Sequence, residues 1–94
     1  MSEINRVLEE RGSRYGNFED HASITQNLKA LVASMLETRK KKLADDQQEA
    51  LDMIFHKIGR IVNGDPDYAD SWVDIAGYAK LVADRLETVP KLKI

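Results

Sequence analysis

Three long segments whose apolar side chains follow helical spacing constrain the fold of this chain most strongly. In each segment apolar residues recur three or four positions apart, which places them on one face of an α-helix. The first segment predicts a helix over about residues 18–41, and the last predicts one over about 67–88. Such a helix of about 22 residues is roughly 33 Å long, close to the diameter of so small a domain, so the helices must lie side by side. The three stripes are Ile24, Leu28, Leu31, Val32, Met35 and Leu36; Leu51, Ile54, Phe55, Ile58, Ile61 and Val62; and Trp72, Ile75, Ala76, Ala79, Val82, Ala83 and Leu86.

Capping and helix-breaking residues indicate where the other helices begin and end. A short first helix is expected over about residues 2–11, followed by a loop with the sequence GSRYGNF. Asp45 or Asp46 is expected to cap the third helix, because a short acidic side chain accepts hydrogen bonds from the free amides of the first turn. The sequence Asn-Gly-Asp-Pro at 63–66 ends that helix, since proline cannot continue the hydrogen-bond ladder.

These patterns predict an all-α fold, a small helical bundle of three long helices plus a short N-terminal helix. No segment shows the alternation of a β-strand. We expect one domain over residues 1–94, with the short helix and its loop at 1–16, the helical core at 17–88 and a tail at 89–94. Three wide apolar stripes leave surface that a monomer of this size covers poorly, so we expect a homo-oligomer in which a second subunit completes the bundle.

Composition excludes several classes of protein. The chain has no cysteine, which rules out disulfides and thiolate metal sites. No apolar run reaches the roughly 18 residues of a membrane span or forms a secretory signal, so we expect a cytoplasmic protein without a membrane partner. A net charge of −2 argues against general nucleic-acid binding. The basic run at 39–42 predicts a solvated helix end, with contact to a small anion or an RNA backbone as the alternative.

Two cations and two carboxylates are expected to meet in the hairpin of the third and fourth helices. Lys57 and Arg60 flank the apolar stripe of the third helix, and Asp70 and Asp74 flank that of the fourth. Residues three or four apart project from the same face of a helix, so each pair acts as a unit. The pairs either neutralise each other across the hairpin or bind a ligand. In the second case the cations hold a phosphate or carboxylate, and the acids orient a hydroxyl, an amine or a metal.

Arg14 and Tyr15 form a second candidate site in the first loop. Tyr15 can stack on a planar ring while Arg14 reaches a phosphate, or Tyr15 and Phe18 can anchor the loop to the core. On the fourth helix, Tyr78 lies one turn after Asp74 and can donate a hydrogen bond to that carboxylate or to a ligand. Gly77 beside it weakens the helix, which predicts that another group packs tightly there.

The remaining motifs give little support to other chemistry. His21 and His56 are the only histidines, too few for a conventional histidine-based metal site. His56 lies four residues after Asp52, which predicts a pair on the helix surface. The chain has no glycine-rich phosphate loop, no recognisable Ser-His-Asp series and no calcium loop.

The order of the motifs resembles the small phage-associated proteins related to the MazG-like all-α nucleotide pyrophosphohydrolases. The resemblance spans about residues 14–86, and the D-I-A-G-Y block at 74–78 is its most specific part. It implies an oligomeric all-α bundle with a pocket between helices, and a ligand that contains a nucleoside and phosphates. The residues that carry it are Arg14, Tyr15, Gly16, Lys57, Arg60, Asp70, Ser71, Asp74, Gly77 and Tyr78.

One departure from the pattern of the hydrolases bears on activity. Catalytic members of that group hold magnesium with a pair of acids on one helix and a second pair on the next. Asp70 and Asp74 resemble the second pair, but Lys57 and Arg60 stand at the positions of the first. Magnesium binds carboxylate oxygens and water, whereas Lys and Arg offer only donors. The resemblance therefore implies a pocket without the usual metal cage.

Three functions follow from this comparison, and the charge reversal favours the first. In the first, the protein binds a nucleotide or nucleotide-derived phosphate ligand without hydrolysing it, with no catalytic residue and no cofactor, and so sequesters a host defence signal in the host cytoplasm. In the second, it is a pyrophosphohydrolase with magnesium held by Asp70, Asp74 and either Glu49 or Asp52. In the third, it is a non-enzymatic inhibitor of a host protein. The ligand-binding residues of the first function are Arg14, Tyr15, Lys57, Arg60, Asp70, Asp74 and Tyr78.

Overall fold

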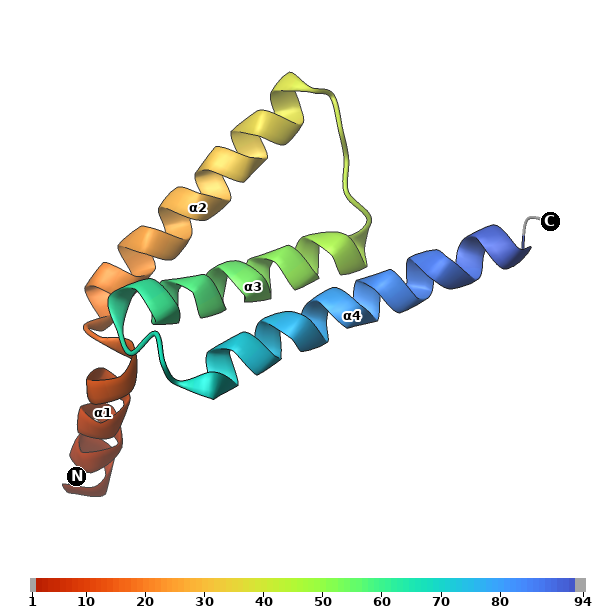
Figure 1. The fold of residues 1–94 in the computed structure, drawn as a ribbon. Helices are drawn as coiled ribbons and strands as arrows, with labels where there is room; N and C mark the ends of the chain where they lie inside the picture. Colours follow the sequence, from red (N-terminus) through yellow and green to blue (C-terminus); the bar gives the residue numbers. More distant parts are fainter. Residues whose placement is uncertain (1, 93–94) are drawn as a thin grey trace.

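In the computed structural model, residues 2–92 form four α-helices and no strand (Figure 1). The structure describes the backbone of residues 2–92 and the side chains of residues 3–88. This architecture confirms the all-α prediction. Within the described residues, no helix is both long and apolar enough to cross a membrane. The helices are α1 (Ser2–Tyr15), α2 (Phe18–Thr38), α3 (Asp45–Asn63) and α4 (Ala69–Leu92).

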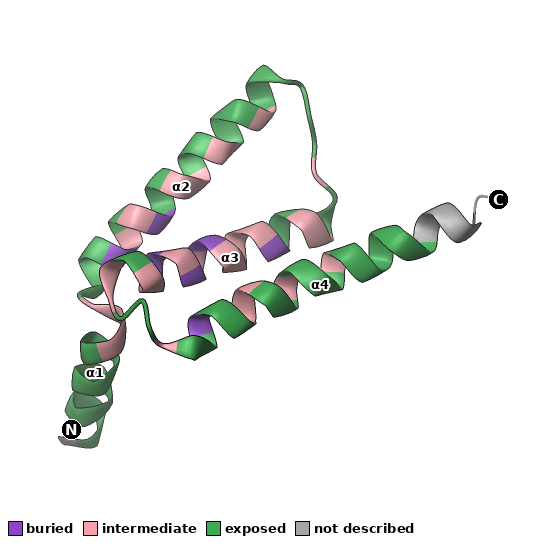
Figure 2. Ribbon diagram, in the orientation of Figure 1, coloured by how far each residue is buried: buried purple, intermediate pink, exposed green. Residues whose placement is uncertain are grey.

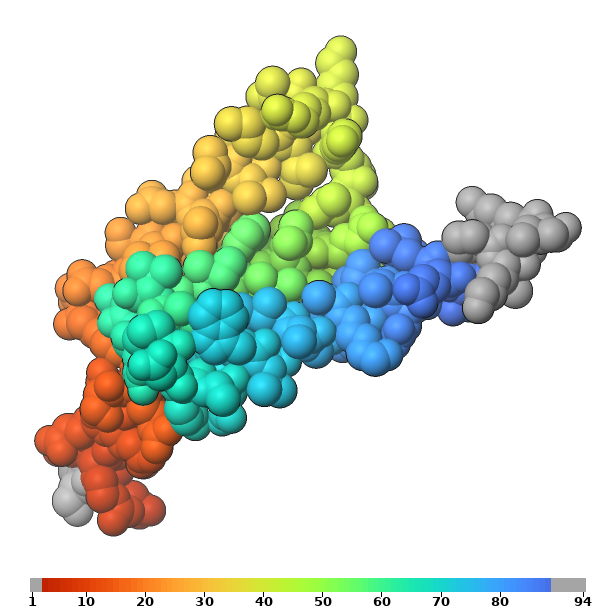
Figure 3. All heavy atoms as spheres, viewed as in Figure 1, coloured from red at the N-terminus to blue at the C-terminus, as the bar shows by residue number. Residues whose placement is uncertain are grey.

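Helix α3 is the centre of the structure, with α2 on one side and α4 on the other (Figure 1). Helix α4 runs alongside α3, whereas α2 meets α3 at one end and then diverges from it. Helix α1 projects from the end where α2 and α3 meet, as Figure 3 also shows, and it contacts both. Over the described residues, α2 and α4 do not touch each other. The helices therefore form a small, open bundle centred on α3, as the predicted fold class implies.

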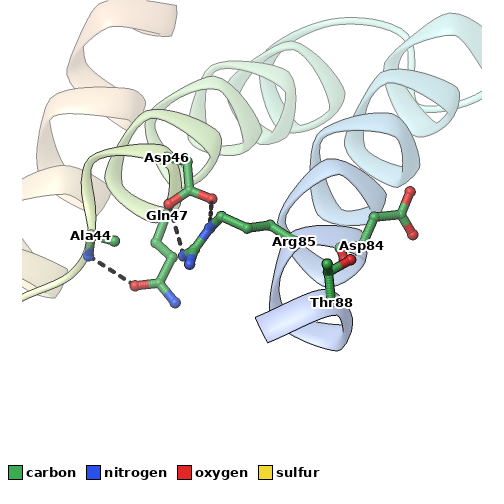
Figure 4. A network of polar contacts seen from close by, with 6 residues as sticks. All are labelled: Ala44, Asp46, Gln47, Asp84, Arg85 and Thr88. Carbon is green, nitrogen blue, oxygen red and sulfur yellow. Dashed lines mark hydrogen bonds and ion pairs between the residues drawn. The ribbon is translucent and has the colours of Figure 1, made fainter. Parts of the chain in front are cut away.

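Capping explains where α2 and α3 begin. Asn17 lies in extended backbone before α2, and its side-chain oxygen accepts hydrogen bonds from the amides of the next turn, at 2.7 Å from Glu19 N. The predicted caps of α3 are wrong, because Asp45 and Asp46 are already the first helical residues. At this end the Gln47 side chain accepts a hydrogen bond from Ala44 N at 2.9 Å (Figure 4).

The other helix ends differ from the predicted ones by a few residues. Helix α1 continues to Tyr15, so Arg14 and Tyr15 lie on its last turn and not in a loop. Helix α2 ends at Thr38, and Lys40 has a φ of 54°, which places most of the basic run beyond the helix. Helix α4 extends to Leu92, so the first four residues of the predicted tail are helical, and residues 93–94 lie outside the described part of the chain.

The described chain buries very little apolar surface (Figure 2). Ala50 and Phe55 are its buried hydrophobic residues, and both belong to α3. The α4 stripe is largely exposed, contrary to the sequence-based prediction, and Trp72 is 54% exposed. The α2 and α3 stripes are half-buried over most of their length. The predicted stripe residues that are exposed are Leu31, Met35, Val62, Trp72, Ala76, Ala79, Ala83 and Leu86.

Candidate functional site

Two short connections lock together near the start of α2 and the end of α3. The side chain of Asn63 donates hydrogen bonds to the carbonyl oxygens of Tyr15 at 3.0 Å and Asn17 at 2.8 Å. The Asp65 amide donates to the carbonyl oxygen of Arg14 at 2.6 Å. Three backbone carbonyl groups around the α1–α2 turn thus accept hydrogen bonds from the end of α3 and the α3–α4 connection. These hydrogen bonds fix the last turn of α1 against the end of α3.

Glycine is required at both crossing points of these connections. Gly16 has a φ of +80°, a conformation that other residues rarely adopt. A Cβ atom at this position would lie 2.1 Å from the Asn63 carbonyl oxygen. A Cβ atom on Gly64 would lie 2.1 Å from the Arg14 carbonyl oxygen. The close backbone approach therefore depends on two glycines, and it brings α1 within reach of the α3 side chains.

Two arginines and two tyrosines pack together at this junction. The Arg60 guanidinium carbon lies 4.2 Å from the centre of the Tyr15 ring, and that of Arg14 lies 4.5 Å from the centre of the Tyr68 ring. The two tyrosine rings are 6.2 Å apart at an angle of 60°. Both cations are within the range of cation–π attraction, so α1, α3 and the α3–α4 connection contribute to one cluster.

Two adjoining cavities flank this cluster. The smaller has a volume of about 370 Å³ and mostly polar walls, which include Glu10, Arg11, Arg14, Tyr15, Arg60 and Tyr68. The larger has a volume of about 510 Å³ and mostly apolar walls, which include Leu8, Tyr15, Phe18, His21, His56 and Arg60. Arg11, Tyr15 and Arg60 line both cavities. The three side chains therefore form a common wall between a cationic space and an apolar one.

The smaller cavity has an excess of positive charge. Arg11, Arg14 and Arg60 lie in its wall with a single carboxylate, that of Glu10. Glu10 pairs with Arg14 at 3.7 Å, and the Glu10 side chain is largely exposed to solvent, whereas Arg14 is half-buried. Among residues 3–88, no ion pair involves Arg11 or Arg60. Two guanidinium groups are therefore available to an anion at this place.

Two histidines meet at the other side of the common wall. His21 Nε2 lies 3.1 Å from His56 Nδ1, with the two rings nearly perpendicular. The predicted surface pair of His56 with Asp52 is wrong, because the Asp52 carboxylate accepts a hydrogen bond from Gln48 at 3.1 Å. Helix α2 can approach α3 closely enough for this contact because the α3 residue that faces it, Gly59, has no side chain. A Cβ atom on Gly59 would lie 2.9 Å from the His21 ring.

Both imidazoles are kept neutral by their surroundings. Burial lowers the pKa of His21, and the positive charge of Arg60 lowers it further. Burial also lowers the pKa of His56 to about 4, with smaller contributions from His21, Arg60, Lys57 and Lys29. At neutral pH each ring therefore carries one proton, and one nitrogen donates while the other accepts.

The predicted group of two cations and two carboxylates is divided in the structure. Lys57 Nζ lies 3.0 Å from an Asp74 carboxylate oxygen, which confirms the expected contact across the α3–α4 hairpin for this pair. Arg60, one turn further along α3, instead covers Tyr15 of α1. Asp70 accepts a hydrogen bond from the Tyr68 hydroxyl at 2.9 Å, which raises the pKa of that tyrosine. Lys57 and Asp74 thus join two helices, whereas Arg60 lines the cavities and Asp70 is not one of their lining residues.

The predictions for Gly77 and Tyr78 find no support within the described chain. A Cβ atom on Gly77 would meet no other atom within 4 Å, so the expected tight packing is absent over the described residues. The Tyr78 side chain makes no hydrogen bond with Asp74 or with any other residue from 3 to 88.

A family model described as a domain of unknown function (DUF6378) matches residues 1–86. The chain belongs to the DUF6378 family. No curated protein and no solved structure matches this chain. The family match covers all the side chains of the two cavities, from α1 to the α3–α4 connection.

Among residues 3–88 of this DUF6378 protein, the acids proposed for a magnesium site do not come together. Among the described side chains, no three His, Asp or Glu residues come close enough together to hold a metal ion. Asp74 is occupied by Lys57, Asp70 by Tyr68 and Asp52 by Gln48. The residues proposed from sequence for a metal-dependent hydrolase therefore do not fit such a centre.

Sequence reasoning missed several residues of the site. Arg11 lies one helical turn before Tyr15, so the two side chains share a face of α1. This relation cannot be seen when the helix is predicted to end at residue 11. Tyr68 lies in the α3–α4 connection, and no neighbouring residue in the sequence indicates its contact with Arg14. The two histidines are 35 positions apart, and only the packing of α2 on α3 brings them together.

Proposed function

We propose that this DUF6378 protein binds a nucleotide or a nucleotide-derived phosphate ligand in the two adjoining cavities and does not hydrolyse it. The observation that carries the proposal is the common wall of Arg11, Tyr15 and Arg60. On one side this wall borders a cationic cavity, and on the other a larger apolar cavity. A ligand with an anionic part joined to a flat apolar part matches both spaces at once.

The arginines suit the phosphate part of such a ligand. A planar guanidinium group binds phosphate oxygens through two parallel N–H donors. A guanidinium that lies over an aromatic ring, as Arg60 lies over Tyr15, still has its N–H edge free for an anion. Arg11 and Arg60 have no carboxylate partner within residues 3–88, so phosphate binding would not first require an ion pair to break.

The proposal assigns new roles to the residues predicted from sequence. Arg14, Tyr15 and Arg60 remain ligand-binding residues. Lys57 and Asp74 instead hold α4 against α3, because each already has the other as its partner. Sequestration of a host defence signal in a phage-infected cell is the biological use that the resemblance to phage-associated MazG-like proteins suggests. The absence of a group of acids suited to magnesium among the described residues favours binding over hydrolysis.

Isothermal titration calorimetry with nucleoside triphosphates and cyclic dinucleotides, with and without magnesium, tests this function. We expect stoichiometric binding, no release of pyrophosphate, and an affinity roughly tenfold or more lower in Arg60→Ala, the typical loss for a charged hydrogen bond. Lys80→Ala is the control, because Lys80 is exposed and pairs with Asp84 on α4, away from the cavities. Full affinity in Arg60→Ala would remove the proposed site.

Other outcomes of the same titrations favour the alternatives. Magnesium-dependent release of pyrophosphate that disappears in Asp74→Ala would favour the pyrophosphohydrolase. Indifference to every nucleotide in the panel would favour the inhibitor of a host protein.

We also propose that the working form is a homo-oligomer. The described chain has an accessible surface of 7232 Å², whereas a compact protein of this mass has about 5,500 Å². Its radius of gyration is 16.5 Å, compared with about 12 Å for a compact chain of this length. The excess surface of about 1,700 Å² per chain is twice the roughly 800 Å² that each partner buries in a standard protein interface. A second copy packed on the exposed apolar side chains of α4 would cover part of it.

A further inference from the structure

We propose that the larger cavity receives the base of the nucleotide, and that the His21–His56 pair forms hydrogen bonds with the edge of that base. The inference rests on the proposed function and deepens it, because it divides the ligand between the two cavities and names the group that selects the base.

The walls of the larger cavity suit a planar aromatic group. Its volume of about 510 Å³ lies within the roughly 300–1,000 Å³ of small-molecule sites. Phe18, in the first turn of α2, lines this cavity and is 76% exposed, so its ring is not required for the core of the described chain. That ring lies 6.2 Å from the His21 ring, at 29° from parallel. With Tyr15 on the common wall, these rings offer faces on which a base can stack.

The histidine pair supplies the polar edge of this otherwise apolar cavity. Among the described residues, His56 Nδ1 contacts His21, whereas His56 Nε2 makes no hydrogen bond and is accessible to solvent on a residue that lines the cavity. Asn17, another polar residue of the wall, already accepts hydrogen bonds through its side-chain oxygen and its carbonyl oxygen, so its side-chain amide could only donate to a base, whereas His56 can either donate or accept. His56 is therefore the polar group best placed to contact a base.

The contact between the two rings permits two arrangements of protons. In one, His21 Nε2 donates to His56 Nδ1, so His56 Nε2 carries a proton and is a donor toward the cavity. In the other, His56 Nδ1 donates to His21 Nε2, so His56 Nε2 is an acceptor and His21 Nδ1 carries the proton. The same position can therefore match either a carbonyl or a ring nitrogen of a base.

Among the described residues, no hydrogen bond of normal geometry fixes this choice, although the Gly59 backbone acts as a weak acceptor for the His21 ring and partly offsets the lowering of its pKa. His21 is 5% exposed, and its Nδ1 is the buried side-chain nitrogen that lacks a hydrogen-bond partner among the described residues. A carbonyl or amide bonded to Nδ1 would select one arrangement, as second partners of histidines usually do. Because only this weak contact with the Gly59 backbone favours one arrangement, a bound base can select the other. Both rings are neutral at pH 7, so they add no charge that would attract phosphate away from the arginines.

Calorimetric titration with inorganic triphosphate and with ATP, GTP, CTP and UTP separates the two cavities. In Phe18→Ala we expect affinity for the nucleotides to fall roughly tenfold, the usual loss for one stacking contact, while affinity for inorganic triphosphate stays the same. Phe18 is largely exposed, so this variant is expected to fold. Val73→Ala, which shortens another largely exposed apolar side chain, on α4, is the control and should leave every affinity unchanged.

The role of the histidines needs a second readout. In His56→Phe the ring remains but the cavity-facing nitrogen is lost, and we expect the differences in affinity among the four nucleotides to shrink. In the wild type, long-range ¹H–¹⁵N correlation spectra should show two neutral imidazoles, and a nucleotide should shift the His56 Nε2 signal while inorganic triphosphate does not. This spectrum decides the question even if His56→Phe fails to fold.

The outcomes distinguish this inference from the function on which it rests. Nucleotides that bind no more tightly than inorganic triphosphate, or an unmoved His56 signal, would overturn the base site and leave the phosphate site in place. Failure of both inorganic triphosphate and nucleotides to bind would overturn the proposed function and this inference together. Binding that depends on Arg60, Phe18 and His56 would support both.

Discussion

The ammonium group of Lys57 lies 3.0 Å from a carboxylate oxygen of Asp74, and only 10% of the lysine side chain is exposed. The carboxylate is 46% exposed and keeps much of its hydration. Removing the lysine charge from water is costly, and Asp74 is the partner that offsets this cost. The pair joins α3 to α4, which otherwise buries little apolar surface against its neighbour.

Loss of Asp74 should therefore destabilise the fold. In Asp74→Ala the buried Lys57 ammonium is left unpaired, and we expect the free energy of unfolding in urea to fall by about 1–3 kcal/mol. The double variant Lys57→Met/Asp74→Ala should lose less than Asp74→Ala alone, because no buried charge remains. Asp84→Ala, which breaks the exposed pair with Lys80, is the matched control and should cost less than about 1 kcal/mol. Equal losses in Asp74→Ala and Asp84→Ala would show that the buried pair does not stabilise the hairpin.

Two helical glycines should respond to alanine in opposite ways. A Cβ atom on Gly59 would lie 2.7 Å from Thr25 Cγ2 and 2.9 Å from the His21 ring, so Gly59→Ala must push α2 from α3. We expect a loss of about 1–3 kcal/mol, typical of overpacking. In Gly77→Ala the new methyl group meets nothing within 4 Å, and the better helix propensity should stabilise α4 by up to about 1 kcal/mol. Thermal unfolding of a dilute monomer checks both, and a lower Tm for Gly77→Ala would contradict the open surface at this position.

The sequence carried enough information to predict the helices but not their burial. Apolar spacing and the Asn-Gly-Asp-Pro stop indicated all four helices, because periodicity and helix breakers are local properties. The same spacing gave Trp72 and Phe55 the same expected environment, yet Phe55 is 7% exposed and Trp72 is 54% exposed. An apolar stripe indicates which face of a helix is buried, but it does not indicate whether the same chain or another molecule covers that face.

The candidate site could be predicted only in part for a related reason. Arg14, Tyr15 and Arg60 stood out as residue types suited to a ligand, and the structure brings them together. The division of Lys57 from Arg60 could not be foreseen, because two residues three positions apart can face different neighbours once helices pack on both sides of α3. The His21–His56 contact depends on the close approach at Gly59, which is a property of the tertiary structure.

Acid should destabilise the protein through its two histidines. Their pKa values are lowered in the folded state, that of His56 to about 4, whereas in the unfolded chain both titrate near 6.5. Below about pH 6.5 the unfolded state therefore binds more protons, so stability is complete above that pH and declines as the pH falls towards 4. Urea unfolding at a series of pH values should show this slope, and His56→Gln should flatten it. An equal slope in His56→Gln and in wild type would place the loss on other groups, such as the carboxylates.

The Asp46–Arg85 pair should hold the far end of α4. Two nitrogens of the Arg85 guanidinium contact the two carboxylate oxygens of Asp46, with Nη2 at 2.9 Å from Oδ1 (Figure 4). This hydrogen-bonded arginine lowers the pKa of Asp46. Lysine cannot reproduce the two parallel donors, so in Arg85→Lys we expect faster amide hydrogen exchange near the end of α4 and unchanged exchange at the centre of α3. Lys80→Ala is the control with an exposed pair on the same helix, and identical exchange in Arg85→Lys and wild type would show that α4 is held without this contact.

The exposed apolar side chains of α4 give the sharpest test of self-association. Leu81 is 68% exposed, Val73 is 64% exposed and Trp72 is 54% exposed. In a monomer these apolar side chains would remain in contact with water, which is unfavourable. We expect sedimentation velocity to show an oligomer for the wild type. Leu81→Lys should shift it towards monomer, because the ammonium would be buried without a partner in the interface. Lys80→Glu, one position away, changes charge without touching an apolar side chain and should change the distribution far less. A wild type that stays monomeric throughout the micromolar range would overturn the oligomer and leave the open arrangement of the helices as the working form.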